Sequence, residues 1–143
     1  MGLNLARYEQ ILVSPPLARP ADIFSLTRIL LVPSVFAEPF GRVSAEALIN
    51  GVPPIVSDRG GLPETVGDGG IVLKLPDWMT ATTRRLPNEA EVEPWFDAVT
   101  RLWDDDAAYA AASRAARAAG VRMYGEDQLR VVYDRWFRSI VAR

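Results

Sequence analysis

Two glutamates, Glu38 and Glu46, stand on either side of a short run, Pro39–Gly41, that is typical of a helix start. Proline suits the first helical turn, because its φ is fixed and its missing N–H costs nothing there. The amides of a first turn lack partners and lie at the positive end of the helix dipole, so they favour phosphate. An ionised carboxylate only accepts hydrogen bonds and therefore suits hydroxyl groups. The pattern favours a diphosphate that joins two hydroxyl-rich rings, as in a sugar nucleotide.

The same residues also have a purely structural interpretation. Glu38 could stabilise the helix dipole, and Glu46 could pair with Arg42, four residues earlier. Gly60 and Gly61 could likewise form only a tight turn. The spacing by itself leaves both interpretations open.

The elements that must position these residues follow from short apolar runs that alternate with helical or turn segments. This alternation predicts an α/β fold with a partial, Rossmann-like, doubly wound parallel sheet. In such sheets ligands bind beyond the carboxyl ends of the strands. Three loops leave such ends: Ser14–Leu17, Pro33–Gly41 and the turn with Gly60 and Gly61. The expected strands are Gln10–Val13, Ile29–Val32, Ile55–Asp58 and Gly70–Leu75.

The remainder of the chain is expected to be helical. We predict one partial domain over residues 1–143, with a strand–helix core over about residues 10–75, a variable loop over 76–93 and helices over 94–143. Gly120 and Gly125 are expected to mark the last helix break. The aromatic residues of these helices are expected to pack the helices together rather than stack on a ligand. They are Trp95, Trp103, Tyr133, Trp136 and Phe137.

The composition limits which side chains could take part in catalysis or metal binding. Cysteine and histidine are absent, which removes disulfides, thiolate metal sites and the commonest general base. Any catalysis must therefore use carboxylates, basic side chains, hydroxyls or amides, and we expect neither a cofactor nor a metal. The net charge of −2 argues against nucleic acid as a partner. No apolar stretch is long enough to span a membrane and no signal-peptide pattern is present, so we expect a cytoplasmic protein.

The run from Pro33 to Glu64 resembles the signature of retaining GT-B glycosyltransferases, a large nucleotide-sugar family that includes glycogen synthases and bacterial mannosyltransferases. Glu38 and Glu46 match its Glu-x7-Glu motif. The similarity is clear over about residues 10–75. The other matching elements are Pro33–Ser34, Pro39–Gly41, Ala47, Gly51, Pro53, Gly60–Gly61 and Glu64.

The resemblance implies a role for each matching residue. Glu38 would be the catalytic residue and would contact hydroxyls of the transferred sugar, helped by the backbone at Phe40 and Gly41. Amides at Gly41, Arg42 and Val43 would meet the diphosphate or the sugar, and Glu46 would hold the ribose. Ser14, Pro15 and Pro16 would lie against the base, with Gly60 and Gly61 also at the site. The reaction would transfer a hexosyl group with retained anomeric configuration.

Two departures from the family qualify this expectation. Arg28 stands where the family usually has an acid, which we expect to affect only local packing. The family has two domains, and the chain matches only the latter part of the second. We expect the acceptor domain, the first two donor-domain strands and the diphosphate-neutralising Arg and Lys to lie outside this chain. The sugar or lipid acceptor would then bind elsewhere, and the chain would be competent only within a fuller enzyme.

The missing strands have a structural consequence. In the family's strand order, 3-2-1-4-5-6, the four runs would be strands 3, 4, 5 and 6. The edge of strand 4 would be exposed, so we predict a homo-oligomer or an exchange of segments. The alternative function is a non-catalytic fold remnant or assembly module.

Overall fold

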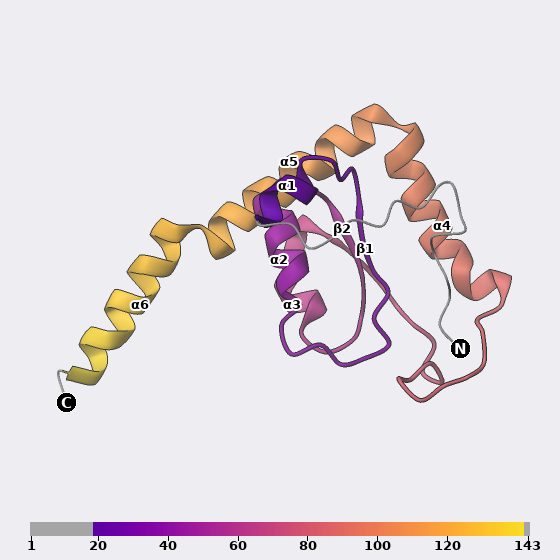
Figure 1. Cartoon of the computed structure of the whole chain (residues 1–143), viewed down its shortest axis with the longest axis horizontal. Coiled ribbons are helices and arrows are strands. Elements are labelled where there is room, and N and C mark those ends of the chain that lie inside the picture. The colour runs from indigo at the N-terminus through magenta and orange to yellow at the C-terminus, as the bar shows by residue number, and fades with distance from the viewer. Residues whose placement is uncertain (1–18, 142–143) are drawn as a thin grey trace.

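The computed structural model describes residues 19–141, which form a small parallel sheet with helices around it (Figure 1). No helix in this range is both long enough and apolar enough to cross a membrane. The elements are α1 (Pro20–Phe24), β1 (Leu30–Val32), α2 (Arg42–Ile49), β2 (Pro54–Ser57), α3 (Leu62–Val66), the 3-10 helix η2 (Gly67–Gly69), β3 (Ile71–Leu73), α4 (Glu89–Asp104), α5 (Asp106–Tyr124) and α6 (Glu126–Val141).

The sheet has three parallel strands in the order β1-β2-β3. Leu31 aligns with Ile55, which in turn aligns with Ile71. Helix α2 lies in the connection between β1 and β2, and α3 in the connection between β2 and β3. Parallel strands joined through helices confirm the predicted α/β class. The run Gln10–Val13, expected to be a further strand, lies outside the described residues.

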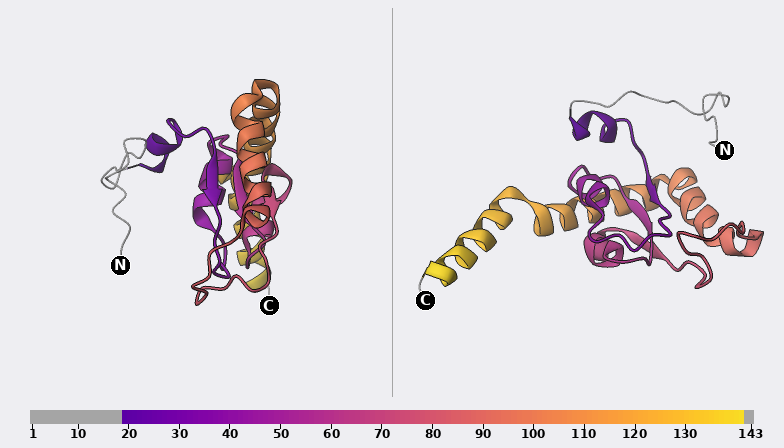
Figure 2. Two further views of the ribbon diagram at one scale, coloured as in Figure 1. Left: turned by 90° about the vertical axis from the view of Figure 1, so that its right-hand side faces the viewer. Right: turned by 60° about the horizontal axis from the view of Figure 1, so that its bottom comes forward.

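The core lies where the central strand β2 meets helices α2 and α3. Leu48, Ile55, Val56, Leu62 and Val66 are each 0% exposed. Helix α5 packs chiefly against α2, which also contacts β1 and β2. Figure 2 shows α4 and α5 along one side of the molecule, with α1 on the other. The helix that carries Glu46 is thus held by contacts with both the sheet and α5.

Helix α2 begins later than the sequence predicts. Its first helical residue is Arg42, and Gly41 is the N-cap with φ +83°. Pro39 lies in the preceding loop, so the expected start at Pro39–Gly41 is wrong. Gly41 turns the chain into the helix through a left-handed conformation that suits glycine. A Cβ at Gly41 would also come to 2.5 Å from Leu62 Cδ2.

Gly120 does not break a helix, contrary to the prediction. Helix α5 continues through it to Tyr124, and only Gly125 separates α5 from α6. Gly120 is buried, and a Cβ there would lie 2.5 Å from both Ile49 N and Leu48 C. The glycine therefore allows the backbones of α5 and α2 to approach closely. Its role is in packing rather than in chain termination.

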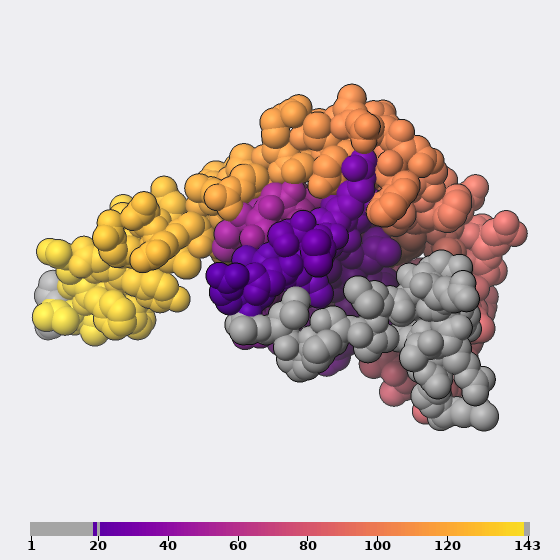
Figure 3. Space-filling view, turned by 45° about the horizontal axis from the view of Figure 1, so that its top comes forward, coloured from indigo at the N-terminus to yellow at the C-terminus, as the bar shows by residue number. Residues whose placement is uncertain are grey.

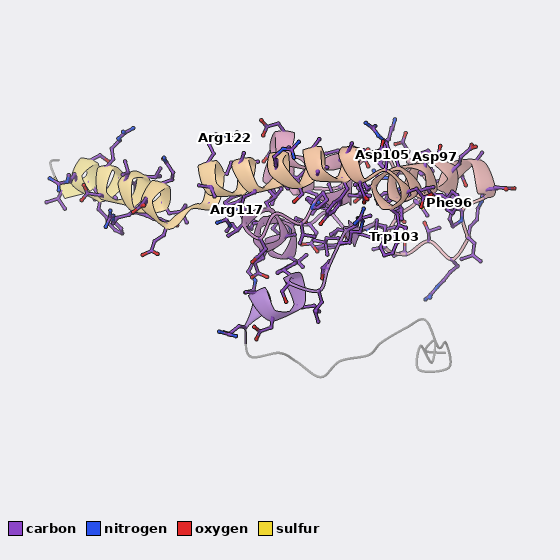
Figure 4. The ribbon with its side chains drawn as sticks, turned by 90° about the horizontal axis from the view of Figure 1, so that it is seen from above. Phe96, Asp97, Trp103, Asp105, Arg117 and Arg122 are labelled. Carbon is purple, nitrogen blue, oxygen red and sulfur yellow. The ribbon has the colours of Figure 1, made fainter. Side chains whose placement is uncertain are left out.

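Arg28 connects the start of the sheet to the turn between α4 and α5. Its guanidinium donates hydrogen bonds to the carbonyls of Leu102 (3.3 Å) and Trp103 (3.4 Å). It also bonds to the Asp106 carboxylate at 2.9 Å and lies 4.0 Å from the Tyr109 ring centroid. A cation is favoured at these carbonyls because they end α4. Figure 4 shows Trp103 at this turn. Arg28 thus has the packing role expected, but it joins segments far apart in sequence.

Helix α4 begins at Glu89, within the segment expected to be a loop. Asn88 caps it: the Glu91 amide donates to Asn88 Oδ1 at 3.0 Å, and the Asn88 amide donates to Glu91 Oε2 at 2.8 Å. This reciprocal pair is a capping box. Trp78 Nε1 donates to Glu91 Oε1 at 2.9 Å. The bond from the Asn88 backbone, with that from Trp78, lowers the pKa of Glu91.

The aromatic residues of α6 are not packed into a core by the other elements of residues 19–141. Tyr133, Trp136 and Phe137 are 54–57% exposed, and α6 has no buried residue. The helix extends away from the other elements (Figures 1 and 3). Trp103 on α4 is also exposed, so the expected packing role is wrong for these four residues. Amphipathic spacing identifies an apolar face, but it does not show whether a neighbour covers that face.

Candidate functional site

The loops that follow β1 and β2 are joined at the carboxyl ends of the two strands. The Gly61 amide donates to the Glu38 carbonyl at 2.6 Å. Beneath it, the buried Ser57 hydroxyl donates to the Ser34 carbonyl at 2.7 Å. These bonds place the loop with Glu38 at the sheet edge where ligands of such folds bind.

Gly60 and Gly61 are explained by this loop contact. Gly60 has φ +60°, and a Cβ on it would lie 2.6 Å from Glu38 N. A Cβ on Gly61 would lie 2.6 Å from the Pro39 carbonyl oxygen. Any side chain at either position would therefore force the loops apart. This packing role requires no ligand, and the expected contact of both glycines with a substrate stays a prediction.

The first turn of α2 has amides that find no hydrogen-bond partner within residues 19–141. The Ser44 amide donates to the Gly41 carbonyl at 2.9 Å. Among residues 19–141, no acceptor is recorded for the amides of Gly41, Arg42 and Val43, and no side chain caps the helix. Unpaired amides at the positive end of a helix attract an anion.

Glu46 and Glu38 lie on either side of this helix start along the chain, but in different surroundings. Glu46 Oε1 is 3.4 Å from Arg42 Nε, so the ion pair that was the structural alternative is present. The Arg42 side chain is 88% exposed and that of Glu46 is 31% exposed. Such an exposed pair is weak, at about 0.3–0.5 kcal/mol, and a ligand could readily replace it. Glu38 is partly buried and has no ion-pair partner among the described residues.

Two further residues, Thr65 and Tyr124, support the loop, and the sequence did not point to them. The Thr65 hydroxyl donates to the Phe40 carbonyl. The Tyr124 hydroxyl donates to the Thr65 carbonyl at 2.7 Å, and its ring meets the Phe40 ring edge-on at 5.6 Å. Burial raises the pKa of Tyr124. These contacts join residues 25 and 59 positions apart, so no local pattern could have revealed them.

Ser44 is another residue near this helix start to which the sequence did not point. Its side chain is fully buried in the first turns of α2, next to Gly41, and its hydroxyl has no hydrogen-bond partner within residues 19–141. An unsatisfied buried hydroxyl costs about 1–3 kcal/mol.

The positive charge near this loop is limited. The Arg59 guanidinium turns inward and donates to the carbonyls of Pro76 (2.8 Å) and Leu75 (3.3 Å), which ties the loop after β2 to the chain after β3. Arg42 is therefore the cation that the described residues place at the helix start. Two hollows lie along α4, one lined by residues that include Phe96 and Asp97 (Figure 4) and the other by Lys74–Asp77 with Ala90, Glu91 and Pro94.

The fold and these loops define an α/β domain with an uncapped helix start that lies between two glutamates along the chain. The family model for glycosyl transferases group 1 matches residues 9–118, more than half of the chain, and the chain belongs to this family. Membership implies glycosyl transfer from a nucleotide-sugar donor to an acceptor. No curated protein matched the chain. Ser14, Pro15 and Pro16, expected to meet the base, lie within the family match but outside the described residues.

Proposed function

We propose that this chain is the donor-binding portion of a retaining GT-B glycosyltransferase that transfers a hexosyl group from a nucleoside diphosphate. The observation that carries the proposal is the uncapped start of α2 at the carboxyl ends of β1 and β2, with a glutamate on either side. Its amides suit phosphate oxygens, and its carboxylates suit hydroxyls. The family match supports the same assignment.

Each residue then has a defined task. Glu38 accepts hydrogen bonds from hydroxyls of the transferred sugar, with the backbone of Phe40 alongside. The amides of Gly41, Arg42 and Val43 hold the diphosphate, and Glu46 exchanges its Arg42 contact for the ribose hydroxyls. Negative charge grows on the diphosphate as its bond to the sugar breaks, so fixed amides stabilise the departing group. The chain thus contributes donor positioning and leaving-group stabilisation.

The remaining parts of the reaction are proposed to come from elsewhere. Arg42 alone is too little positive charge for a diphosphate, so further cations and the sugar or lipid acceptor would be held by another domain. Ser14, Pro15, Pro16, Gly60 and Gly61 complete the donor contacts in this proposal.

A non-catalytic assembly module is the second candidate. Within the described residues β1 pairs on one side only, with β2, and Leu31 on it is about half exposed. An unpaired strand edge is a template for another chain. Homo-oligomers or exchanged segments formed at this edge would serve such a role without turnover.

Calorimetric titration of the 143-residue chain with UDP, GDP and ADP separates the two candidates. If the donor-site proposal holds, one nucleotide binds with a Kd of about 1 mM or below, and Glu46→Ala weakens it at least about tenfold. Glu93→Ala, an exposed glutamate on α4, is the matched control and should bind as the wild type does. A folded wild-type chain that binds none of the three would contradict the donor site and favour the assembly module.

A further inference from the structure

Arg59 connects two of the loops at the carboxyl ends of the strands. It follows the end of β2, yet its guanidinium is bonded to the chain that follows β3. Its Nη2 donates to the Pro76 carbonyl at 2.8 Å, to that of Leu75 at 3.3 Å and to that of Met79 at 3.4 Å. The side chain is 23% exposed, and its Nε lies 3.9 Å from Asp58 Oδ1, too far for a hydrogen bond. Arg59 is therefore held by backbone carbonyls rather than by a counter-ion.

The loop that Arg59 holds is itself anchored. The Leu75 amide donates to Asp58 Oδ1 at 3.1 Å, and Leu75 is 4% exposed. Further along this loop, Trp78 donates to Glu91 in the first turn of α4 at 2.9 Å. The chain after β3 is thus tied both to the end of β2 and to α4. A side chain that binds this loop is bound to a fixed point.

On its other side, Arg59 leads into the turn that touches Glu38. The Gly61 amide donates to the Glu38 carbonyl, and a Cβ on Gly60 would come to 2.3 Å from the same oxygen. Among residues 19–141, Gly61 makes the only hydrogen bond recorded between Glu38 and a residue outside the loop after β1. Because the two backbones are in contact, a shift of the turn would move the backbone of Glu38 with it.

We propose that Arg59 is a positioning residue for Glu38. Its guanidinium holds the turn at Gly60 and Gly61 to the chain after β3, and this sets where the Glu38 carboxylate meets the sugar of the donor. The role rests on the proposed donor site, to which it adds a residue that does not itself touch the donor.

The effect of Arg59 should be confined to the sugar half of the donor. The unpaired amides and Glu46 belong to α2, which packs against α5 and contacts β1 and β2. None of the bonds of the Arg59 guanidinium reaches α2. Loss of the guanidinium should therefore weaken the binding of a sugar nucleotide but not that of the nucleoside diphosphate. A general loss of stability would not separate the two ligands in this way.

Calorimetric titration of the whole chain with UDP-glucose, GDP-mannose and ADP-glucose, each compared with its nucleoside diphosphate, measures the two halves separately. For the pair that binds, Arg59→Met should raise the Kd of the sugar nucleotide at least about fivefold and change that of the nucleoside diphosphate by less than about twofold. Arg59→Lys keeps a charged donor on a flexible stem and should restore part of the loss.

Two control experiments separate positioning from stability. Arg28 is also partly buried and also donates to two backbone carbonyls, but it precedes β1 and so lies at the opposite end of the strands. Arg28→Met removes comparable bonds and should leave both Kd values unchanged. In a chain that already carries Glu38→Ala, Arg59→Met should raise the Kd of the sugar nucleotide by less than about twofold, because both substitutions act on one contact.

Amide hydrogen exchange at Gly61, measured by nuclear magnetic resonance, tests the contact without any ligand. A loop amide exchanges through local opening, so exchange should be at least about tenfold faster in Arg59→Met and unchanged in Arg28→Met. Unchanged exchange in Arg59→Met, equal losses for both ligands, or full additivity with Glu38→Ala would overturn the positioning role. A wild-type chain that binds neither ligand would instead refute the donor site, and faster Gly61 exchange would still show that Arg59 holds the turn against Glu38.

Discussion

Replacing Gly120 with alanine should destabilise the fold, although alanine is the best helix former. Gly120 lies inside α5 where this helix crosses the end of α2. The added Cβ would lie 2.5 Å from Ile49 N and Leu48 C, and 2.7 Å from Leu48 O. These are backbone atoms, which cannot rotate away as a side chain can. Helix α5 would have to move outward and loosen the support of α2.

The magnitude follows from two opposing terms. Glycine to alanine within a helix gains about 1 kcal/mol of helix propensity. Overpacking costs about 1–3 kcal/mol, and a clash with fixed backbone belongs at or above the upper end of that range. The expected net loss of unfolding free energy is therefore about 2 kcal/mol. For a chain of this size the loss lowers the Tm by roughly 6 °C.

Urea unfolding followed by circular dichroism measures this loss. Ala111→Gly, at an exposed position of the same helix, isolates the propensity term and should cost about 1 kcal/mol. The close approach of α5 and α2 would be refuted if Gly120→Ala were as stable as the wild type or more stable.

Two further predictions concern the attachment of α4. Arg28→Lys keeps the charge but loses the forked bonds to Leu102 and Trp103 and the stacking on Tyr109. The unfolding free energy should therefore fall by about 1 kcal/mol. An unchanged midpoint of urea unfolding would show that these contacts contribute nothing. Folding lowers the pKa of Glu91 from its ordinary value of 4.5, so its stabilising contribution is present above that pH and is lost as the pH falls through the folded pKa. Glu91→Gln keeps a capping side chain without this ionisation, and unfolding free energies measured as the pH falls below about 5 should therefore show a shallower decline than in the wild type. If the unfolding free energy fell equally steeply with pH in the wild type and in Glu91→Gln, the lowered pKa of Glu91 would be contradicted.

Local patterns account for what the sequence predicted well. Short apolar runs bounded by proline and glycine mark β1, β2 and β3, because a buried parallel strand needs a continuous apolar stretch. Gly51 follows α2 with φ +72°, a left-handed conformation that suits glycine at the end of a helix. Glu38 and Glu46 lie on either side of the start of α2 along the chain, as the sequence predicts. Each of these signals lies within a few neighbouring residues.

The tertiary structure decided what depends on contacts between distant residues. Gly120 looks like a helix break until α2 is placed against it, and Tyr124 supports Phe40 only because α5 brings the two together. The aromatic spacing of α6 is visible in the sequence, but its exposure is not, because exposure depends on what the other elements leave uncovered. Periodicity and turn chemistry are properties of neighbouring residues and can be inferred from them. Close backbone approach and burial are properties of pairs of elements, and only the folded chain specifies those pairs.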